Sequence, residues 1–442
     1  MDADIIIKNV LIADGSGAEP FSGCVAINNG IITHVGNDIT CCCEETYDGD
    51  QKLLCPGFID SHSHSDISCI ASPESIGKIS QGITTEIVGN CGLSVFPVTS
   101  KNREHLEHIY NRYNVAVSWN NLSEYAHFVN RVTPSVNIVS LCGYNTLRAA
   151  ITGYSEKHIS KEQSNEVKKL INESMLMGAV GLSTGFIYVP GLFSDQNEII
   201  DALSFFGKFE KPYATHIRSE GNHLLESLGE TFDNSAHAKI LHTHISHLKT
   251  SGKNNWHKID DALHLVREFR KNGFNVSADR YPYTSSMAQL SVFLPDKFSC
   301  MNDQTLNNKL ADKFFYDQFV KEISLDGIER WENKRLVDTS SVENNKFTGL
   351  KLTEIATKKS QTVFELIAEL LKEDTAGTNV SSEGMSEENM KKIIFEDYVC
   401  CGSDESSRPI DFSFGKSHPR GFGSFPEFFK IVSQNKGIGE AI

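Results

Sequence analysis

The strongest constraint on the fold is a pair of histidines, His62 and His64, that directly follows an apolar run at residues 53–59. We predict that this run is a buried strand. Side chains at alternate positions of an extended backbone point to the same side, so both imidazoles can converge on one point, as a metal ion requires. A His-x-His pair is weak support by itself, because surface and core histidines are common. The hypothesis therefore depends on the residues that follow later strands.

The composition argues against several classes of partner. The chain has 442 residues, which is enough for a large core, and 39% of them are hydrophobic and 22% charged. Its formal net charge of −15 argues against binding to nucleic acids or to anionic membranes. No apolar run approaches the roughly 20 residues of a membrane-spanning helix. We expect no nucleic-acid or membrane partner, and the sequence leaves the oligomeric state open.

The cysteines and the N-terminus together indicate the compartment. The chain has 11 cysteines, an odd number that does not suggest a framework of disulfide bonds. The N-terminal residues, Met1-Asp2-Ala3-Asp4-Ile5, show neither a basic region nor the apolar core of a signal peptide. We therefore expect a cytoplasmic protein in a reducing environment.

The first 52 residues predict a small β-module. Residues 24–35 read as a hairpin around the turn Asn28-Asn29-Gly30, because Asn-Gly is a strong signal for a tight β-turn. From residue 53 onward the pattern changes to strand, polar loop and helix, repeated. The clearest helix covers residues 160–177, with Ser160 and Gln163 as a capping box and Gly178 as its end.

The repeats predict an α/β fold, a TIM (β/α)8 barrel, behind the small N-terminal β-module. Eight is the number of strands that closes such a barrel. The predicted strands lie at residues 53–59, 84–89, 136–141, 179–183, 212–216, 239–245, 274–279 and 398–402. The segment 284–396 is too long for a plain repeat, so we expect an insertion before the last barrel strand that serves as a lid. A separate small domain or a disordered loop is the alternative.

Polar residues follow five of these strands, where a TIM barrel carries its active site. Imidazole, thiolate and carboxylate are the ligand types of zinc. The residues are His62 and His64 after the first strand, Cys91 after the second, His216 at the fifth, His247 after the sixth and Asp404 after the eighth. Each has a simpler interpretation, such as a buried thiol or a helix cap, and His242 and His244 inside the sixth strand fit core positions. Joint placement at five strand ends favours a metal site.

Such a site can hydrolyse an amide bond. Zinc with an open coordination position lowers the pKa of its water to about 7 and polarises a carbonyl group. A carboxylate at the eighth strand, Asp404, can take the proton of the water and later donate it to a leaving amine.

The motifs resemble a known family. Gly57-Phe58-Ile59-Asp60-Ser61-His62-Ser63-His64 is similar to the first-strand signature of the amidohydrolase superfamily. Further segments resemble the N-acyl-D-amino-acid deacylases, or D-aminoacylases, over essentially the whole chain. These segments are Gly89-Asn90-Cys91-Gly92, GAVGLSTGFIYVPG at 178–191, Thr215-His216-Ile217-Arg218-Ser219-Glu220-Gly221, Ile245-Ser246-His247-Leu248-Lys249, Asp279-Arg280-Tyr281-Pro282-Tyr283, Gly402-Ser403-Asp404 and His418-Pro419-Arg420.

The resemblance implies roles for the strand-end residues. A tightly held zinc would be bound by Cys91, His216 and His247, and a second, weaker position by His62 and His64, with Cys91 and Asp404 shared. Asp404 would be the catalytic acid and base. Many members of the superfamily bridge two metals with a carboxylated lysine on the fourth strand. Residues 178–191 contain no lysine, so Cys91 is the expected bridging ligand.

The resemblance also implies a substrate. Lys249 and Tyr281 would contact the carboxylate of an N-acyl amino acid, and Arg420 is a second anchor, because a carboxylate needs fixed positive charge and donors. The implied reaction is zinc-dependent hydrolysis of an N-acyl-D-amino acid to a carboxylate and a free D-amino acid. Two alternatives stay open. One is another amidohydrolase, such as a cyclic-amide hydrolase or a dipeptidase, and the other is a truncated, inactive member that acts as a binding module.

The chain departs from the family pattern at its C-terminus. In the family, strands after the barrel complete the small β-module. This sequence stops at Gly439-Glu440-Ala441-Ile442, so we expect these strands to be absent and the module of residues 1–52 to have an exposed sheet edge.

Overall fold

The computed structural model of the chain describes residues 2–37, 42–154 and 158–442. It divides into two compact units, of which the first contains residues 1–58 and 425–442 and the second residues 59–424. This division groups residues 53–58 and 425–442 with the N-terminal module, whereas the sequence pattern places them in the barrel segment. Residues 1 and 38–41 of the predicted module lie outside the described residues.

The first unit contains a sheet in the order β3-β2-β1-β4, with β5 also paired to β1. Its strands are β1 (Asp2–Ile12), β2 (Phe21–Asn28), β3 (Ile31–Gly36), β4 (Cys42–Asp48) and β5 (Leu53–Leu54). The predicted hairpin is confirmed, because β2 and β3 pair in antiparallel fashion around Asn29 and Gly30. Both turn residues have positive φ angles, 51° and 74°, which a type I′ turn requires. The helices α17 (Arg420–Lys436) and α18 (Ile438–Ala441) end the chain.

The second unit is built on parallel strands. They are β6 (Phe58–Asp60), β7 (Ile83–Val88), β8 (Asn137–Ser140), β9 (Cys142–Gly143), β10 (Leu182–Gly185), β11 (Tyr213–His216), β12 (His242–Ile245), β13 (Asn275–Arg280) and β17 (Val399–Cys401). They form one sheet in the order β6-β7-β8 and another in the order β9-β10-β11-β12-β13-β17. A parallel bridge between Ser63 and Glu405 joins the segments that follow β6 and β17.

The prediction of one buried strand at residues 53–59 is wrong. Two short strands, β5 and β6, replace it, and Ile59 is 58% exposed. Pro56 and Gly57 explain the interruption, since proline has no backbone N–H for a sheet and glycine weakens a strand. As a result β5 pairs with β1, and β6 begins the second set of strands.

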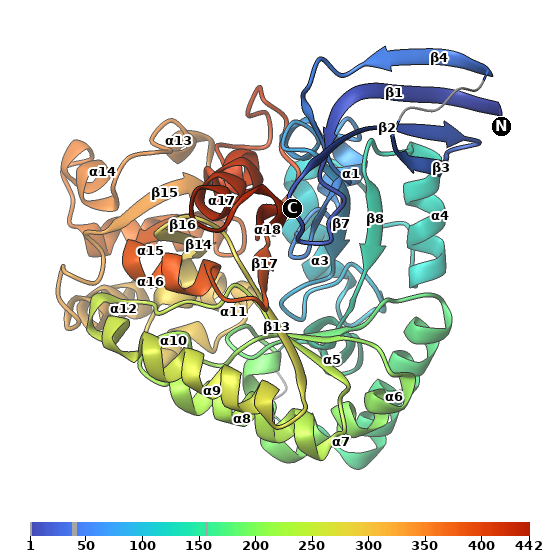
Figure 1. The fold of residues 1–442 in the computed structure, drawn as a ribbon. Coiled ribbons are helices and arrows are strands. Elements are labelled where there is room, and N and C mark those ends of the chain that lie inside the picture. Colours follow the sequence, from blue (N-terminus) through green and yellow to red (C-terminus); the bar gives the residue numbers. More distant parts are fainter. Residues whose placement is uncertain (1, 38–41, 155–157) are drawn as a thin grey trace. The chain divides into compact units, whose positions relative to one another are not determined.

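Helices alternate with these strands, and α6, α7, α8 and α9 follow one another around the lower part of the view in Figure 1. The helices are α1 (Ser68–Ala71), α2 (Ile76–Ile79), α3 (Arg103–Tyr110), α4 (Leu122–Val132), α5 (Tyr144–Thr152), α6 (Lys161–Leu176), α7 (Gln196–Phe206), α8 (Leu224–His237), α9 (Ile259–Lys271) and α16 (Glu387–Ile394). Short 3-10 turns are η1 (Asn111–Tyr113), η2 (Gly191–Phe193), η3 (Gly207–Phe209), η4 (Lys253–Lys258) and η5 (Leu290–Phe293). The predicted capping box of α6 is confirmed, with reciprocal hydrogen bonds of 3.2 and 2.8 Å between Ser160 and Gln163.

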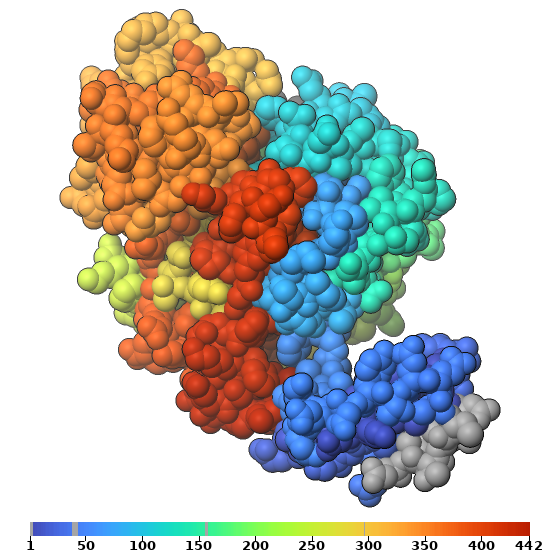
Figure 2. All heavy atoms as spheres, turned by 90° about the horizontal axis from the view of Figure 1, so that it is seen from above, coloured from blue at the N-terminus to red at the C-terminus, as the bar shows by residue number. Residues whose placement is uncertain are grey.

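The long insertion before the last parallel strand is folded. It contains an antiparallel sheet in the order β14-β16-β15, formed by β14 (Ser285–Gln289), β15 (Lys334–Asp338) and β16 (Asn379–Glu383). Its helices are α10 (Asp296–Ser299), α11 (Asp303–Leu310), α12 (Lys313–Ser324), α13 (Val342–Asn345), α14 (Leu352–Lys358) and α15 (Val363–Asp374). A separate hydrophobic core around Trp331, Leu336 and Leu366 holds these elements together. Most of the insertion forms one contiguous orange lobe on the surface (Figure 2). Its helices, its sheet and its core exclude a disordered loop.

Among the described residues, no helix combines the length and the apolar character that crossing a membrane requires.

Candidate metal centre

A cavity of about 930 Å³ opens at the carboxyl ends of the parallel strands. Its lining includes most of the predicted site residues, namely His64, Cys91, His216, His247, Lys249, Tyr281, Asp404 and Arg420. Residues of the insertion, among them Met287, Phe293 and Met301, complete the wall. His62 is fully buried beneath the cavity lining rather than part of it.

The chain holds His62 and His64 in an extended segment directly after β6. The backbone N–H of Ser63 donates to the carbonyl of Ile87 at 3.0 Å, and that of His64 donates to the carbonyl of Glu405 at 3.2 Å. The Nε2 atoms of His62 and His64 lie 3.5 and 3.3 Å from Oδ1 of Asp404. The structure therefore brings both side chains together at one carboxylate oxygen, although the histidines lie beyond the strand itself.

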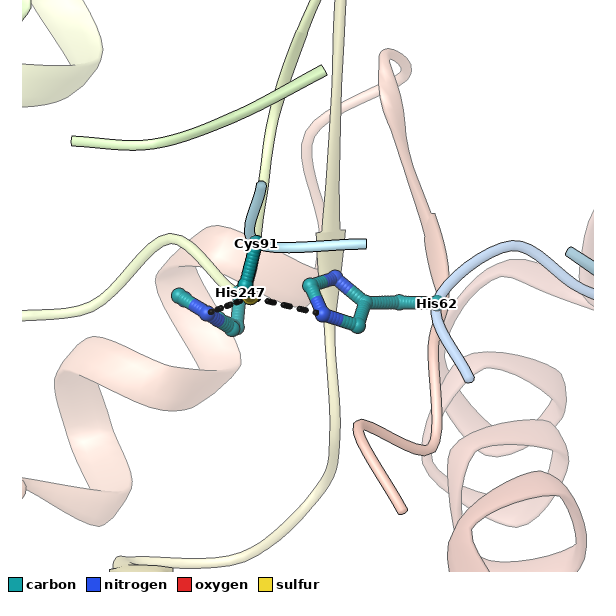
Figure 3. Close-up of side chains that lie close together, drawn as sticks. All are labelled: His62, Cys91 and His247. Atoms are coloured by element: carbon teal, nitrogen blue, oxygen red, sulfur yellow. Dashed lines mark hydrogen bonds between the residues drawn. The ribbon is translucent and has the colours of Figure 1, made fainter. Parts of the chain in front are cut away.

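Cys91 lies between two imidazoles (Figure 3). Its Sγ atom is 3.3 Å from Nε2 of His62 and 3.5 Å from Nε2 of His247. Burial raises the pKa of the Cys91 thiol, but the positive charges of His62 and His247 outweigh this effect and hold the pKa well below its ordinary value. The site therefore favours a thiolate, the form of cysteine that binds metals.

His216 and His247 meet above Glu220. The ring centroids of the two histidines are 4.3 Å apart. Nδ1 of His247 lies 2.8 Å and Nε2 of His216 lies 3.8 Å from Oε1 of Glu220. Both ring nitrogens of His216 are buried, and among the described residues neither has a hydrogen-bond partner. A buried imidazole without partners carries an energetic cost that a ligand would relieve.

The remaining polar groups surround Asp404. Arg420 donates from Nη1 to Oδ2 of Asp404 at 2.6 Å, and its guanidinium carbon lies 4.8 Å from the centre of the Tyr281 ring. The Tyr281 hydroxyl is buried and has no hydrogen-bond partner among the described residues. Lys249 forms an ion pair with Glu220, and its Nζ is 2.9 Å from Nδ1 of His247.

Three of these residues adopt a backbone conformation that is unusual for side chains. Cys91, His247 and Asp404 have φ angles of 55°, 37° and 51°, in the left-handed region. Such conformations cost about 1–3 kcal/mol each and persist where the surroundings enforce them, often at functional sites. At each position the chain turns sharply after a strand, and this turn directs the side chain towards the cluster.

The comparisons with known proteins agree with this geometry. No family model matches the chain. A D-aminoacylase of Alcaligenes xylosoxydans xylosoxydans is 26% identical over 435 residues, which cover 98% of this chain and 80% of that protein. An N-acyl-D-aspartate deacylase of the same organism is 28% identical over 292 residues. That match covers 65% of this chain, and the chain spans 58% of the length of that deacylase.

Two solved structures share the fold. The N-acyl-D-glutamate deacylase of Bordetella bronchiseptica, complexed with zinc and a phosphonate inhibitor, matches with a TM-score of 0.81 at 21% identity. The match covers 100% of this chain and 84% of that one. A D-aminoacylase described as defining a novel subset of amidohydrolases matches with a TM-score of 0.79 at 25% identity, and covers 99% and 83% of the two chains.

The chain is similar to the D-aminoacylases over nearly its whole length. Its amidohydrolase fold brings together side chains that could hold a metal ion, and in each of three groups the donor atoms lie within 4.8 Å of one another. These groups are His62-Cys91-His247, His62-His64-Asp404 and His216-Glu220-His247. Thiolate, imidazole and carboxylate donors suit zinc, and the unpartnered His216 nitrogens are explained if a metal lies beside them. The residues present therefore fit this metal.

Sequence reasoning missed two carboxylates that contact histidines of this site. Oε1 of Glu220 lies 2.8 Å from Nδ1 of His247, and Asp279 accepts from Nδ1 of His62 at 2.9 Å. Burial raises the pKa of Asp279, but the charge and hydrogen bonds of His62 and His244 hold it well below its ordinary value. The sequence did contain a signal for these two carboxylates, because both lie in segments that resemble the family and stand near strand ends.

Proposed function

We propose that the chain is a zinc-dependent amidase that hydrolyses N-acyl-D-amino acids to a carboxylate and a free D-amino acid. The observation that carries the proposal is the position of the buried Cys91 side chain between His62 and His247, in a cluster that includes a carboxylate, Asp404, at a large cavity. The similarity to D-aminoacylase over nearly the whole chain supports the choice of this amide substrate.

We assign the tight zinc position to Cys91, His216 and His247, and a weaker second position to His62, His64, Cys91 and Asp404. The contacts of Cys91 with histidines on both sides support its role as the bridging ligand. The unpartnered nitrogens of His216 support its place in the tight position. When bound, zinc supplies a Lewis acid that polarises the scissile carbonyl and lowers the pKa of a water molecule.

Asp404 transfers the proton of the attacking water molecule in this reaction. Arg420 occupies its Oδ2 atom, whereas Oδ1 faces His62 and His64 at the floor of the cavity. Burial raises the pKa of Asp404, but Arg420 and His247 hold it well below its ordinary value, so the group is ionised and able to accept a proton. Asp404 takes the proton at Oδ1 and then donates it to the leaving amide nitrogen.

Lys249, Tyr281 and Arg420 bind the carboxylate of the substrate. All three line the cavity beside the metal cluster, and two of them are cationic. The buried Tyr281 hydroxyl has no partner among the described residues, so it is available as a donor. Charge-assisted hydrogen bonds of this kind fix both the position and the orientation of a carboxylate.

We also propose that the parallel strands form a closed (β/α)8 barrel, with the insertion at residues 284–396 as a lid. The bridge between Ser63 and Glu405 supports closure between the segments after the first and last strands. Several insertion residues line the cavity, which supports a covering role. All cysteines whose side chains are described are free thiols, which supports the proposal that the protein functions in a reducing compartment such as the cytoplasm.

A paired assay tests the reaction. We expect zinc-loaded protein to release free amine from N-acetyl-D-amino acids and to leave the corresponding L-enantiomers almost unchanged. Amine release is measured for both series, with zinc content determined on the same sample. Turnover of neither series by protein with bound zinc would disprove the proposal, and equal turnover of both would disprove the stereochemical part.

The variant Lys249→Met tests the carboxylate anchor. A hydrogen bond to a charged group contributes about 1.5–3 kcal/mol, so we expect kcat/KM to fall about 10- to 150-fold, mainly through a higher KM. Steady-state kinetics on an N-acetyl-D-amino acid measures the change. Lys253→Met, at an exposed lysine nearby, is the matched control. An unchanged KM in the Lys249 variant would contradict the assignment.

A further inference from the structure

A row of hydrogen bonds links side chains of the neighbouring strands β12 and β13 and ends at His62. Nε2 of His242 lies 2.7 Å from Oγ of Ser277, and the same oxygen lies 2.7 Å from Nδ1 of His244. Nε2 of His244 then lies 2.9 Å from Oδ2 of Asp279, which also accepts from Nδ1 of His62 at 2.9 Å. The two histidines of β12, which the sequence pattern assigns to plain core positions, are therefore connected to the metal cluster.

The alternation of side chains along the strands creates this row. His242 and His244 occupy alternate positions of β12, and Ser277 and Asp279 occupy alternate positions of β13. The two strands are parallel neighbours, with His242 paired to Asn275 and His244 paired to Ser277. Side chains at alternate positions share one face, so the four polar groups interleave in a single row.

One assignment of protons satisfies every link in the row. His242 donates from Nε2–H to the Ser277 oxygen, and the Ser277 hydroxyl donates to Nδ1 of His244. His244 donates from Nε2–H to Asp279, and His62 donates from Nδ1–H to the same oxygen. In this assignment His62 carries its proton on Nδ1. Its Nε2 lone pair then faces Cys91 and Asp404, where a metal ligand must present it.

The packing around Asp279 leaves little freedom. Asp279 and His62 are fully buried. A Cβ atom on Gly402 would lie 2.6 Å from Oδ1 of Asp279 and 2.8 Å from Cβ of His62, so the neighbouring strand end contacts the pair closely. The Asp279 carboxylate is thus confined between Gly402, His62 and His244, and His244 is the neighbour that supplies a second hydrogen bond to the oxygen held by His62.

We propose that His244, with Ser277 behind it, is a positioning residue that locks Asp279 and thereby fixes His62 with Nε2 directed at the metal. Mutation of a carboxylate that holds a metal-binding histidine typically lowers the affinity for the metal. In this protein the effect on metal affinity extends beyond the carboxylate Asp279 to His244, which is neither a proposed metal ligand nor a proposed substrate contact. The inference rests on the metal site of the proposed function and not on its substrate, so metal binding tests it separately from amide hydrolysis.

The test compares two replacements of His244 in the full chain. In His244→Gln the amide nitrogen takes the place of Nε2 and can still donate to Asp279, whereas His244→Leu fills similar space without a donor. Zinc is titrated into metal-free protein, and the absorption spectrum of the cobalt-loaded protein reports on the ligands. We expect His244→Leu to lower the affinity of the weaker, His62-containing position about 10- to 100-fold and to change the cobalt spectrum. His244→Gln should stay close to the parent protein.

Three controls keep the result interpretable. Thermal unfolding of the metal-free proteins shows whether each variant is folded. Should His244→Leu fail to fold, Ser277→Ala removes the donor behind His244 with little change of volume, and it should weaken the same metal position to a smaller extent. His237→Leu, at an exposed histidine of α8, should change neither readout. Unaltered zinc affinity and cobalt spectrum in folded His244→Leu or Ser277→Ala would overturn the proposal, as would equal losses in His244→Leu and His244→Gln.

Discussion

Replacing Asp404 with asparagine should remove nearly all turnover while the protein keeps its most tightly bound metal ion. Asparagine preserves the shape of the side chain but cannot accept a proton, and positioned proton transfer contributes about 10²- to 10⁴-fold to rate. We therefore expect kcat on an N-acetyl-D-amino acid to fall by that factor. The tight position should survive because its proposed ligands, Cys91, His216 and His247, are unchanged.

The measurement pairs steady-state kinetics with metal analysis of the same protein. Asp411→Asn, an exposed carboxylate seven residues later in the chain, is the matched control and should leave both quantities unchanged. Asp404 also balances the charge of Arg420 at 2.6 Å, so thermal unfolding of the variant should be recorded as well. A folded Asp404→Asn protein that loses its zinc but keeps its turnover would contradict the assigned role.

The change Cys91→Ala should have the largest effect on metal content. Its thiolate contacts His62 and His247, and in our assignment it contributes to both metal positions. Altering only a residue behind a ligand typically costs 10- to 100-fold in metal affinity, so we expect the loss of this shared ligand to cost more than about 100-fold. Activity should fall with the metal content, because a water molecule is no longer activated.

Equilibrium dialysis against buffered zinc measures this loss. Cys142→Ala is the matched control, because Cys142 is also a fully buried thiol but lies in the hydrophobic core. We expect it to bind zinc normally and to lose about 1 kcal/mol of unfolding free energy, the usual cost of removing one small group from a core. Retention of both zinc ions by Cys91→Ala would disprove the bridging role.

Local signals predicted several elements of the fold correctly. Ser160 and Gln163 form the expected capping box, and Asn29 and Gly30 form the expected hairpin turn, since each depends on residues only a few positions apart. The prediction of a single strand at residues 53–59 was wrong because it depended on distant residues. The apolar run was visible, but the division of its two halves between β1 and the second set of strands depends on distant pairing partners.

The candidate site shows the same division between local and distant information. Strand-end placement predicted His62, His64, Cys91, His216, His247 and Asp404 as site residues, and the structure brings them together in one cluster beside the cavity. The pattern missed Glu220 and Asp279, because a carboxylate becomes the partner of a histidine only through its position in space. For the same reason His242 and His244 looked like ordinary core residues until β13 placed Ser277 and Asp279 beside them.

The sequence alone determined which chemical groups stand at the ends of the strands, and hence that a metal-binding site with imidazole, thiolate and carboxylate donors was the expected result. Only the tertiary structure decided which groups meet. It placed Cys91 between His62 and His247, Arg420 on Asp404, and Asp279 behind His62. The physical reason is that periodicity along a strand specifies the direction of a side chain, whereas the partner it reaches depends on strand pairing, sharp left-handed turns and packing between segments far apart in the chain.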